Sequence, residues 1–447
     1  MKKLLMILNF IFLSSAPSFA VLKVNVNKAR FAPTPIAVTP TFTESHDPEN
    51  LAYKMTQVIE SDLDRCGLFK PIDQKSFIQE ASSLRRAPRF EDWKLIKAKL
   101  LTVSFLTRVD DKLNLTLKLF DVLTGVEMGV YSFEDSPSNW RKIAHKIADQ
   151  VYQRTTGELG YFSTKIVYVA ETGSARNPLQ KLSIIDQDGA NLRNLTDGSR
   201  SISSPVFSPT AQMIAYAAYH KNEQAKIYLM NLETGLSQLF VDQSKGGGIA
   251  FAQRFSADGS KLIFSIAKGG TTSLYTKNIK MGSTGGDIVR LTRNIGAIDT
   301  HPCYSPDGEK VVFESDMSGR RRQLYTMNAD GSDIKKISRD AGALYGEPVW
   351  SPRGDWIACL KIHKGVFYIC IMKPDGSSER LIDKGYQLQD PTWSPNGRVL
   401  LYKKQGKFDS RGNIVKRIHS IDLTGHNSRE IKTNTNAEMP AWSPVIR

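Results

Sequence analysis

The chain has 447 residues, of which 60 are Lys or Arg and 45 are Asp or Glu, so its net charge is +15. This length predicts two or three domains. With 40% hydrophobic and 23% charged residues, the composition is that of a globular protein and excludes wholesale disorder or a collagen-like repeat. The positive charge suggests an acidic partner or surface, without indicating which.

The first twenty residues have the layout of a secretory signal peptide. Lys2 and Lys3 form a basic start, residues 4–13 are mostly apolar, and the small residues of Ser18-Phe19-Ala20 suit cleavage after Ala20. The apolar stretch is shorter than the ~20 residues of a transmembrane helix. We therefore expect an exported chain that begins at Val21 and spans no membrane. Loss of the two lysines lowers its net charge to +13.

An aromatic residue followed by Ser, and mostly by Pro, recurs six times in the C-terminal part. The serines are Ser208, Ser256, Ser305, Ser351, Ser394 and Ser443, whose numbers differ by 48, 49, 46, 43 and 49. This period is typical of propeller blades. Turn pairs such as Asp258-Gly259 follow the phrase and predict β-hairpins, and apolar strands such as 310–314 come next. The repeat therefore predicts four-stranded blades.

The two ends of this array complement each other. The sixth phrase, at Trp442-Ser443-Pro444, lacks the strands that follow the other phrases, whereas the strands expected at 165–170 and 182–186 lack a phrase before them. One blade built from both ends would close the ring and leave no open sheet edge. Residues 161–447 give about 48 residues for each of six blades. We predict an all-β six-bladed propeller over this range.

The region before it, residues 21–158, has the pattern of an α+β domain. Asp47-Pro48 is a helix-start signal, and the apolar residues of 51–63 follow helical spacing. Strict alternation over 101–119 predicts a half-buried β-hairpin. Helical spacing returns over 140–151. Helices flanking a small sheet predict an α+β domain.

Catalytic and metal-binding motifs are missing from the sequence. It contains no His-Glu-x-x-His, Gly-x-Ser-x-Gly, Walker or Asp-x-Asp-x-Asp pattern, so we expect no catalytic residue, cofactor or metal. His145 lies beside the apolar face of its helix, which favours a structural or surface imidazole over a catalytic one. Arg320-Arg321-Arg322 is interpreted as a solvated hairpin tip and not as a nucleic-acid site.

Four cysteines in an exported chain allow disulfides. Cys359 and Cys370 are symmetric about a predicted turn at Lys364-Gly365 and would face each other across two strands. Two interpretations are open: a disulfide, or two buried thiols acting as small hydrophobic groups. The thiols are favoured, because a disulfide needs a specific approach of the two Cβ atoms. Cys66 and Cys303 have no obvious partners.

Two segments resemble a known family most closely. They are Pro-Ile-Ala-Val-Thr-Pro at residues 35–40 and Ala-His-Lys-Ile-Ala-Asp-Gln-Val-Tyr at 144–152, and the match continues through 156–158 and 165–170. On these residues the chain resembles the TolB family, periplasmic propeller proteins of the Tol–Pal system. The resemblance implies a monomeric, non-enzymatic periplasmic adaptor between the inner-membrane protein TolA and the lipoprotein Pal. Such an adaptor supports outer-membrane invagination during cell division and outer-membrane integrity.

The resemblance also implies two sets of contact residues. The expected TolA contacts are Val21, Leu22, Lys23, Val24, Asn25, Val26 and Asn27. Their alternation suits a strand added to a partner sheet, and pairing within their own domain is the open alternative. The expected Pal contacts, which should gather around one mouth of the channel, are Ile249, Phe251, Thr300, His301, Glu347, Asp390 and Glu438.

The alternative function is an exported hydrolase of the serine peptidase type, in which a propeller guards a catalytic domain. Such an enzyme needs an α/β-hydrolase domain with a nucleophile elbow, and the sequence has no such motif. The adaptor is therefore the favoured prediction.

Overall fold

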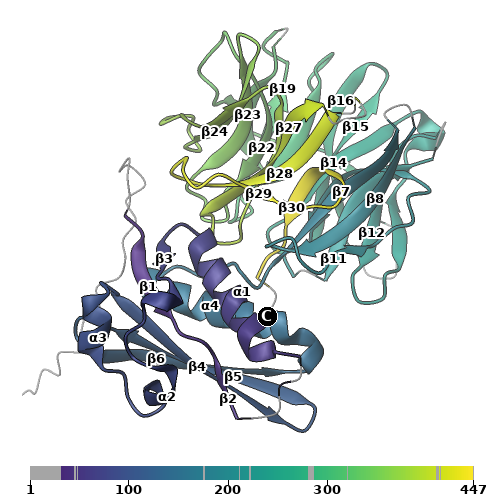
Figure 1. The fold of residues 1–447 in the computed structure, drawn as a ribbon. Coiled ribbons are helices and arrows are strands. Elements are labelled where there is room, and N and C mark those ends of the chain that lie inside the picture. Colours follow the sequence, from purple (N-terminus) through teal and green to yellow (C-terminus); the bar gives the residue numbers. More distant parts are fainter. Residues whose placement is uncertain are drawn as a thin grey trace, which may run out of the picture.

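The computed structural model describes residues 32–445, except 45, 46, 48, 175, 176, 211, 221, 222, 280–285, 320, 409–411 and 413. The predicted signal peptide and the segment Val21–Asn27 lie outside the described residues. The described chain forms a mixed α/β domain followed by a six-bladed β-propeller (Figure 1), which confirms the predicted fold class. No helix in the described ranges is long and apolar enough to span a bilayer.

The N-terminal domain contains one mixed sheet of six strands. These are β1 (Thr34–Val38), β2 (Phe42–Thr43), β3 (Phe69–Pro71), β4 (Leu100–Val109), β5 (Lys112–Asp121) and β6 (Val126–Asp135). The order is β3-β1-β4-β5-β6, and β2 pairs with β4. The α-helices are α1 (Leu51–Arg65), α2 (Ala81–Leu84), α3 (Phe90–Leu95) and α4 (Trp140–Thr156).

Alternating leucines of β5 explain how the two long helices pack. Leu113, Leu115, Leu117 and Leu119 are buried, and because side chains alternate along a strand they all face the same side of the sheet. The apolar sides of α1 and α4 belong to the same buried cluster. The predicted hairpin and the two predicted long helices are therefore confirmed.

The start of α1 differs in detail from the prediction. The helix begins at Leu51, and its N-cap residue, Asn50, has a left-handed backbone and makes no side-chain capping bond. Asp47 supplies the acceptor instead, because its carboxylate accepts hydrogen bonds from the N–H groups of Leu51 and Ala52 at 2.8 and 2.9 Å. Asp47 therefore accepts the first free N–H groups of the helix, as predicted, although it lies three residues before the N-cap position.

The propeller consists of six four-stranded antiparallel sheets, and each sheet runs from an inner strand to an outer one. In this direction, blade 1 is β30 (Asn436–Trp442), β7 (Lys165–Ser174), β8 (Asn177–Asp186) and β9 (Arg193–Asn194). Blade 2 is β10 (Ser201–Phe207), β11 (Met213–Tyr219), β12 (Lys226–Asn231) and β13 (Ser237–Val241). Blade 3 is β14 (Ile249–Phe255), β15 (Lys261–Lys268), β16 (Thr271–Asn278) and β17 (Val289–Arg290).

The remaining blades follow the same plan. Blade 4 is β18 (Asp299–Tyr304), β19 (Lys310–Ser315), β20 (Gln323–Asn328) and β21 (Lys335–Lys336). Blade 5 is β22 (Leu344–Trp350), β23 (Ile357–His363), β24 (Val366–Met372) and β25 (Arg380–Gly385). Blade 6 is β26 (Leu388–Trp393), β27 (Val399–Phe408), β28 (Ile414–Asp422) and β29 (Arg429–Ile431).

Blade 1 joins the two ends of the propeller, as predicted. Strand β30 pairs antiparallel with β7, with Trp442 opposite Ile166. Ser443 and Lys165 extend this pairing, because the Ser443 N–H donates to the Lys165 carbonyl at 2.8 Å and the Lys165 N–H donates to Ser443 Oγ at 2.9 Å. The last strand therefore closes the ring.

The N-terminal domain contacts one face of the propeller. Asn396, between the first and second strands of blade 6, donates at 2.8 Å to the carbonyl of Leu159, in the connection that directly follows this domain. Asn427, between the third and fourth strands, donates to the Arg65 carbonyl at 2.6 Å. We call this side, formed by these two kinds of turn, the near face. The far face carries the turns between second and third strands and the connections between blades.

The two paired cysteines correct the favoured interpretation. Cys359 and Cys370 form a disulfide between β23 and β24, and both residues are fully buried. They are directly opposite in the register, and their Cα atoms lie 5.3 Å apart. That separation is within the usual disulfide range, so a directly opposed strand pair accommodates the bond. Cys66 and Cys303 are free and buried.

Candidate functional site

A ring of six equivalent residues surrounds the channel on the propeller axis. Each inner strand has one residue with a left-handed backbone, φ between 50° and 57°, at the same place in the blade: Ser204, Ala252, His301, Glu347, Asp390 and Met439. The register with the second strand shifts at each of these points. Such bulges redirect side chains, and all six residues line one cavity of about 230 Å³.

The ring residues are linked from blade to blade. The N–H of Asp390 donates to Glu347 Oε2 at 2.5 Å, and the N–H of Met439 donates to Asp390 Oδ2 at 3.3 Å. The N–H of Glu347 donates to Oε2 of Glu314, on the second strand of the preceding blade, at 2.7 Å. A left-handed non-glycine residue costs about 1–3 kcal/mol, and these bonds help to hold it in place.

We call this cavity, its lining residues and the side chains that contact them the mouth. Glu314, on β19 of blade 4, is a buried carboxylate of the mouth. Its side chain is fully buried, and Oε1 accepts a hydrogen bond from Thr300 Oγ1 at 2.6 Å. The same oxygen lies 2.9 Å from Arg322 Nη1 and 3.2 Å from His301 Nδ1. Burial alone would raise the pKa of Glu314, but His301, Thr300 and Arg322 together lower it to about 2. This carboxylate is therefore ionised and fully partnered.

Glu347 behaves in the opposite way. Burial, followed by repulsion from Asp390, raises the pKa of Glu347 to about 7, although His301 acts against this shift. The ammonium of Lys403 lies 3.9 Å from the Asp390 carboxylate and 3.6 Å from the Glu438 carboxylate. Lys416 also contacts Glu438, at 3.3 Å. The mouth thus combines a tightly held anion, a carboxyl that favours its neutral form, and an ion-pair network.

The seven residues expected to contact Pal occupy three kinds of position. His301, Glu347 and Asp390 line the cavity. Thr300 and Glu438 are buried. Thr300 donates a hydrogen bond to Glu314, and Glu438 forms ion pairs with Lys403 and Lys416. Ile249 and Phe251 belong to the far-face half of β14, where Ile249 is 40% exposed and Phe251 is partly buried.

Other residues of the cavity were not predicted, notably Arg254, Lys403 and the ring positions Ser204, Ala252 and Met439. A sequence signal for the ring does exist. In five blades a proline stands three residues before the repeated serine, directly after the ring residue: Pro205, Pro302, Pro348, Pro391 and Pro440. Because proline has no N–H to give to a strand ladder, a recurrent proline inside a strand indicates a bulge. In blade 3 Gln253 replaces it and donates to the Ser204 carbonyl at 2.6 Å.

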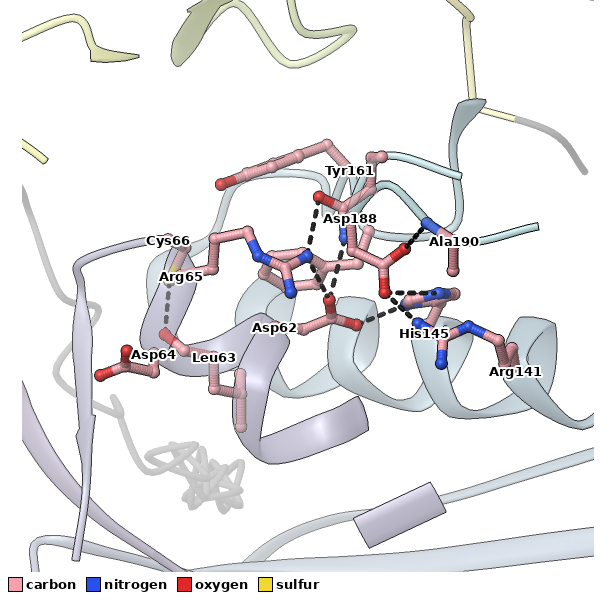
Figure 2. A network of polar contacts seen from close by, with 12 residues as sticks. Asp62, Leu63, Asp64, Arg65, Cys66, Arg141, His145, Tyr161, Asp188 and Ala190 are labelled. Atoms are coloured by element: carbon pink, nitrogen blue, oxygen red, sulfur yellow. Dashed lines mark hydrogen bonds and ion pairs between the residues drawn. The ribbon is translucent and has the colours of Figure 1, made fainter. Parts of the chain in front are cut away.

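A second polar cluster joins the domains on the near face (Figure 2). Asp62 on α1 is fully buried and lies 2.5 Å from Nδ1 of His145 on α4. It also accepts a bond from Gln187 Nε2, at 2.9 Å, in the turn after β8. Asp188 of the same turn forms an ion pair with Arg141 of α4. We call these five residues the domain junction.

Asp62, His145 and Asp188 also have the residue types of a metal site, with ligand atoms within 4.8 Å of one another. Each carboxylate, however, already contacts a guanidinium: Arg65 lies 3.3 Å from Asp62, and Arg141 pairs with Asp188. A divalent cation would therefore compete with two arginines. Burial acts to lower the pKa of His145, but Asp62 outweighs it and raises this pKa. The buried imidazole is structural, one of the two roles predicted for it.

Comparison with known proteins gives the family. A model described as the TolB beta propeller domain matches residues 152–446, and one described as the TolB amino-terminal domain matches residues 22–128. The chain belongs to the TolB family. This TolB-family chain is 39% identical over 443 residues to the Tol-Pal system protein TolB of Rickettsia bellii (strain OSU 85-389), covering 97% of this chain and 98% of the relative.

Two further relatives agree. The Tol-Pal system protein TolB of Pelagibacter ubique (strain HTCC1062) is 42% identical over 439 residues, covering 96% of each chain. The crystal structure of TolB from Acinetobacter baumannii superposes with a TM-score of 0.79 at 22% identity, covering 94% of this TolB-family chain and 98% of the other. This structural likeness shows that the two proteins share their fold.

Proposed function

We propose that this TolB-family chain is a non-enzymatic periplasmic adaptor of the Tol–Pal system. After export and cleavage behind Ala20, it consists of the domain 21–158 and the propeller 161–447. Val21–Asn27 bind a TolA-like inner-membrane protein, and the far face of the propeller binds a Pal-like peptidoglycan-associated lipoprotein. The chain thereby supports outer-membrane invagination during cell division and outer-membrane integrity.

The apolar side chains exposed on the far face support a protein partner there. Ile295 and Tyr386 lie in connections between blades and are 102% and 74% exposed. Phe408 ends β27 at a turn on the same face and is 71% exposed. Exposed apolar and aromatic side chains are typical of protein-binding surfaces.

The cavity on the propeller axis is the observation that carries the proposal. It opens among the ring residues, and charged groups of Arg254, Glu347, Asp390 and Lys403 line it. A polar recess on the axis, together with apolar residues exposed on the far face, offers a partner both buried area and specific hydrogen bonds.

The first experiment tests the far face with matched variants. Ile295→Asp and Ile249→Asp should each weaken binding of the purified periplasmic domain of the Pal-like lipoprotein by at least about tenfold, because each places a charge in the apolar contact. Leu236→Asp is the control, since Leu236 is 73% exposed in a near-face turn. Calorimetric titration gives the affinities. Equal losses for all three variants, or none, would contradict the proposal.

Substitutions at Thr300 are less suitable for this test. Thr300 is buried and donates a hydrogen bond to the Glu314 carboxylate. An acidic residue there would place a second carboxylate beside the first and disturb the fold itself. The exposed isoleucines separate partner binding from folding.

A second experiment tests the N-terminal segment. Deletion of residues 22–27 should abolish binding to the periplasmic part of the TolA-like protein and leave binding of the Pal-like domain within about twofold, because a strand added to a partner sheet binds through its own backbone. Replacement of the same residues by a Gly/Ser segment of equal length controls for chain length. Retained TolA-like binding in both variants would reject this role.

A further inference from the structure

Arg254 stands out among the charged groups of the cavity. It belongs to β14 of blade 3, next to the ring residue Ala252, and lines the cavity with the other charged residues. Its Nη1 donates to the Gln253 carbonyl at 3.1 Å. Within the described part of the chain it forms no ion pair, although a guanidinium carries five N–H donors in a fork that fits a carboxylate.

The other charges of the mouth have opposite charges or backbone partners in contact. Arg322 pairs with Glu314 at 2.9 Å, and Lys403 lies between Asp390 and Glu438. Glu347 and Asp390 each accept a backbone N–H from the next blade. Arg254 is therefore the charge whose hydrogen-bonding capacity is used least.

The surroundings of Arg254 have an electrostatic consequence. Burial lowers the pKa of Arg254, and Cys303, Asp390 and Glu347 counteract this from a distance, without an ion pair among the described residues. A cation removed from bulk water without a contacting anion favours any carboxylate that reaches it. Arg254 lines the cavity of about 230 Å³, which is large enough to hold a carboxylate side chain.

On the basis of the proposed function, we propose that Arg254 binds an aspartate or glutamate side chain of the protein that docks on the far face. The carboxylate would enter the channel and pair with the guanidinium fork, while the apolar residues exposed on the far face hold the rest of the partner surface. Arg254 is then a specificity-determining residue, because a partner lacking this acid would leave the guanidinium unpaired in the closed interface.

The experiment titrates the periplasmic domain of the Pal-like lipoprotein against the full mature chain and its variants. Arg254→Gln should weaken binding at least about tenfold, and Arg254→Lys less, because an ammonium keeps the charge but not the fork. Arg193→Gln is the control, since Arg193 is an exposed arginine on the outer strand β9. It should bind like the parent chain. Melting temperatures of all variants monitor folding.

A double-mutant cycle then identifies the acid. Each exposed Asp or Glu of the partner domain is changed to Asn or Gln and titrated against the parent chain and Arg254→Gln. We expect one partner variant to lose at least about tenfold with the parent chain and little with Arg254→Gln. If no partner acid shows this coupling, the inference is wrong even when Arg254→Gln binds weakly.

The outcomes separate this inference from the proposed function. Normal binding by Arg254→Gln together with weak binding by Ile295→Asp would overturn the role of Arg254 and leave the far face as the docking surface. Normal binding by both variants would reject the far face itself.

Discussion

The domain junction and the mouth both contain buried charged side chains, and they differ in how many of these charges have an ion-pair partner within the chain. At the domain junction, a buried aspartate and histidine, Asp62 and His145, join two helices to a propeller turn, and Arg65 and Arg141 complete the pairing. At the mouth, Glu314 and His301 form a similar pair, but Arg254 faces the cavity without an ion pair in the described structure.

The difference shows which interface the chain completes by itself. A buried ion pair is stabilising only when its partners are in place, and at the junction the two domains supply these partners, although Arg141 Nε and His145 Nε2 are buried without a hydrogen bond among the described residues. At the mouth, Arg254 lines the cavity without an ion pair among the described residues, and apolar side chains are exposed on the far face. This is expected of a surface that a second protein covers, where binding is favoured at the expense of stability.

The largest expected effect comes from opening the ring, which supports both faces. Deletion of residues 442–447 removes Trp442, whose indole N–H donates to Thr164 Oγ1 at 2.7 Å, and the pairing of Ser443 with Lys165. Loss of the buried indole alone costs about 3–5 kcal/mol. We expect a fall in melting temperature of more than about 10 °C by calorimetry. Deletion of Ile446 and Arg447 alone is the control, and an equal melting temperature for the two deletions would contradict the closure.

The second largest effect on stability is expected at the domain junction. Asp62→Ala leaves His145, Arg65 and Gln187 without their common acceptor, so the free energy of unfolding should fall by about 3–5 kcal/mol. Asp64→Ala is the matched control, because the Asp64 side chain is 38% exposed and its ion pairs should contribute less than about 1 kcal/mol. Urea denaturation gives both values. Similar losses for the two variants would mean that the junction is not a buried network.

A smaller, pH-dependent effect is expected at Glu314. Its pKa is lowered to about 2 in the folded state, so the stabilisation is present above the ordinary pKa of 4.5 and is lost as the pH falls towards 2. Glu314→Gln should therefore lower the free energy of unfolding by about 3 kcal/mol at pH 7, with a difference that shrinks below pH 4.5. Denaturation curves between pH 3 and 7 measure it. A difference independent of pH would contradict the assigned charge.

The smallest effect on stability is expected at Glu347, where the substitution should stabilise the chain at high pH. The pKa of Glu347 is raised to about 7, so its contribution to stability is present below pH 4.5 and is lost as the pH rises through 7. Glu347→Gln should be close to the parent chain at pH 5 and more stable at pH 8, by up to about 1 kcal/mol after allowance for solvent screening. Melting temperatures at both pH values test this. A less stable variant at pH 8 would show that the mouth is paired as completely as the junction.

The repeat made the propeller predictable, whereas the junction depends on contacts between distant residues. Six serines at regular spacing and the complementary ends predicted the blades and their closure, because local turn chemistry and strand pattern agree. The ring carried a signal too, in prolines such as Pro348 and Pro391 before the repeated serine. Asp62 and Asp188 are far apart in sequence and meet only when the domains dock. Their pairing could not be predicted from local pattern.

Amide hydrogen exchange with and without the periplasmic domain of the Pal-like lipoprotein shows whether that domain docks on the far face. Protection should appear in the far-face segments 243–250, 291–299 and 385–388, because a docked protein covers their exposed amides. The near-face turns 231–237 and 373–377 should exchange at the same rate in both samples. Protection confined to the near-face turns, with no change at the three far-face segments, would contradict the account.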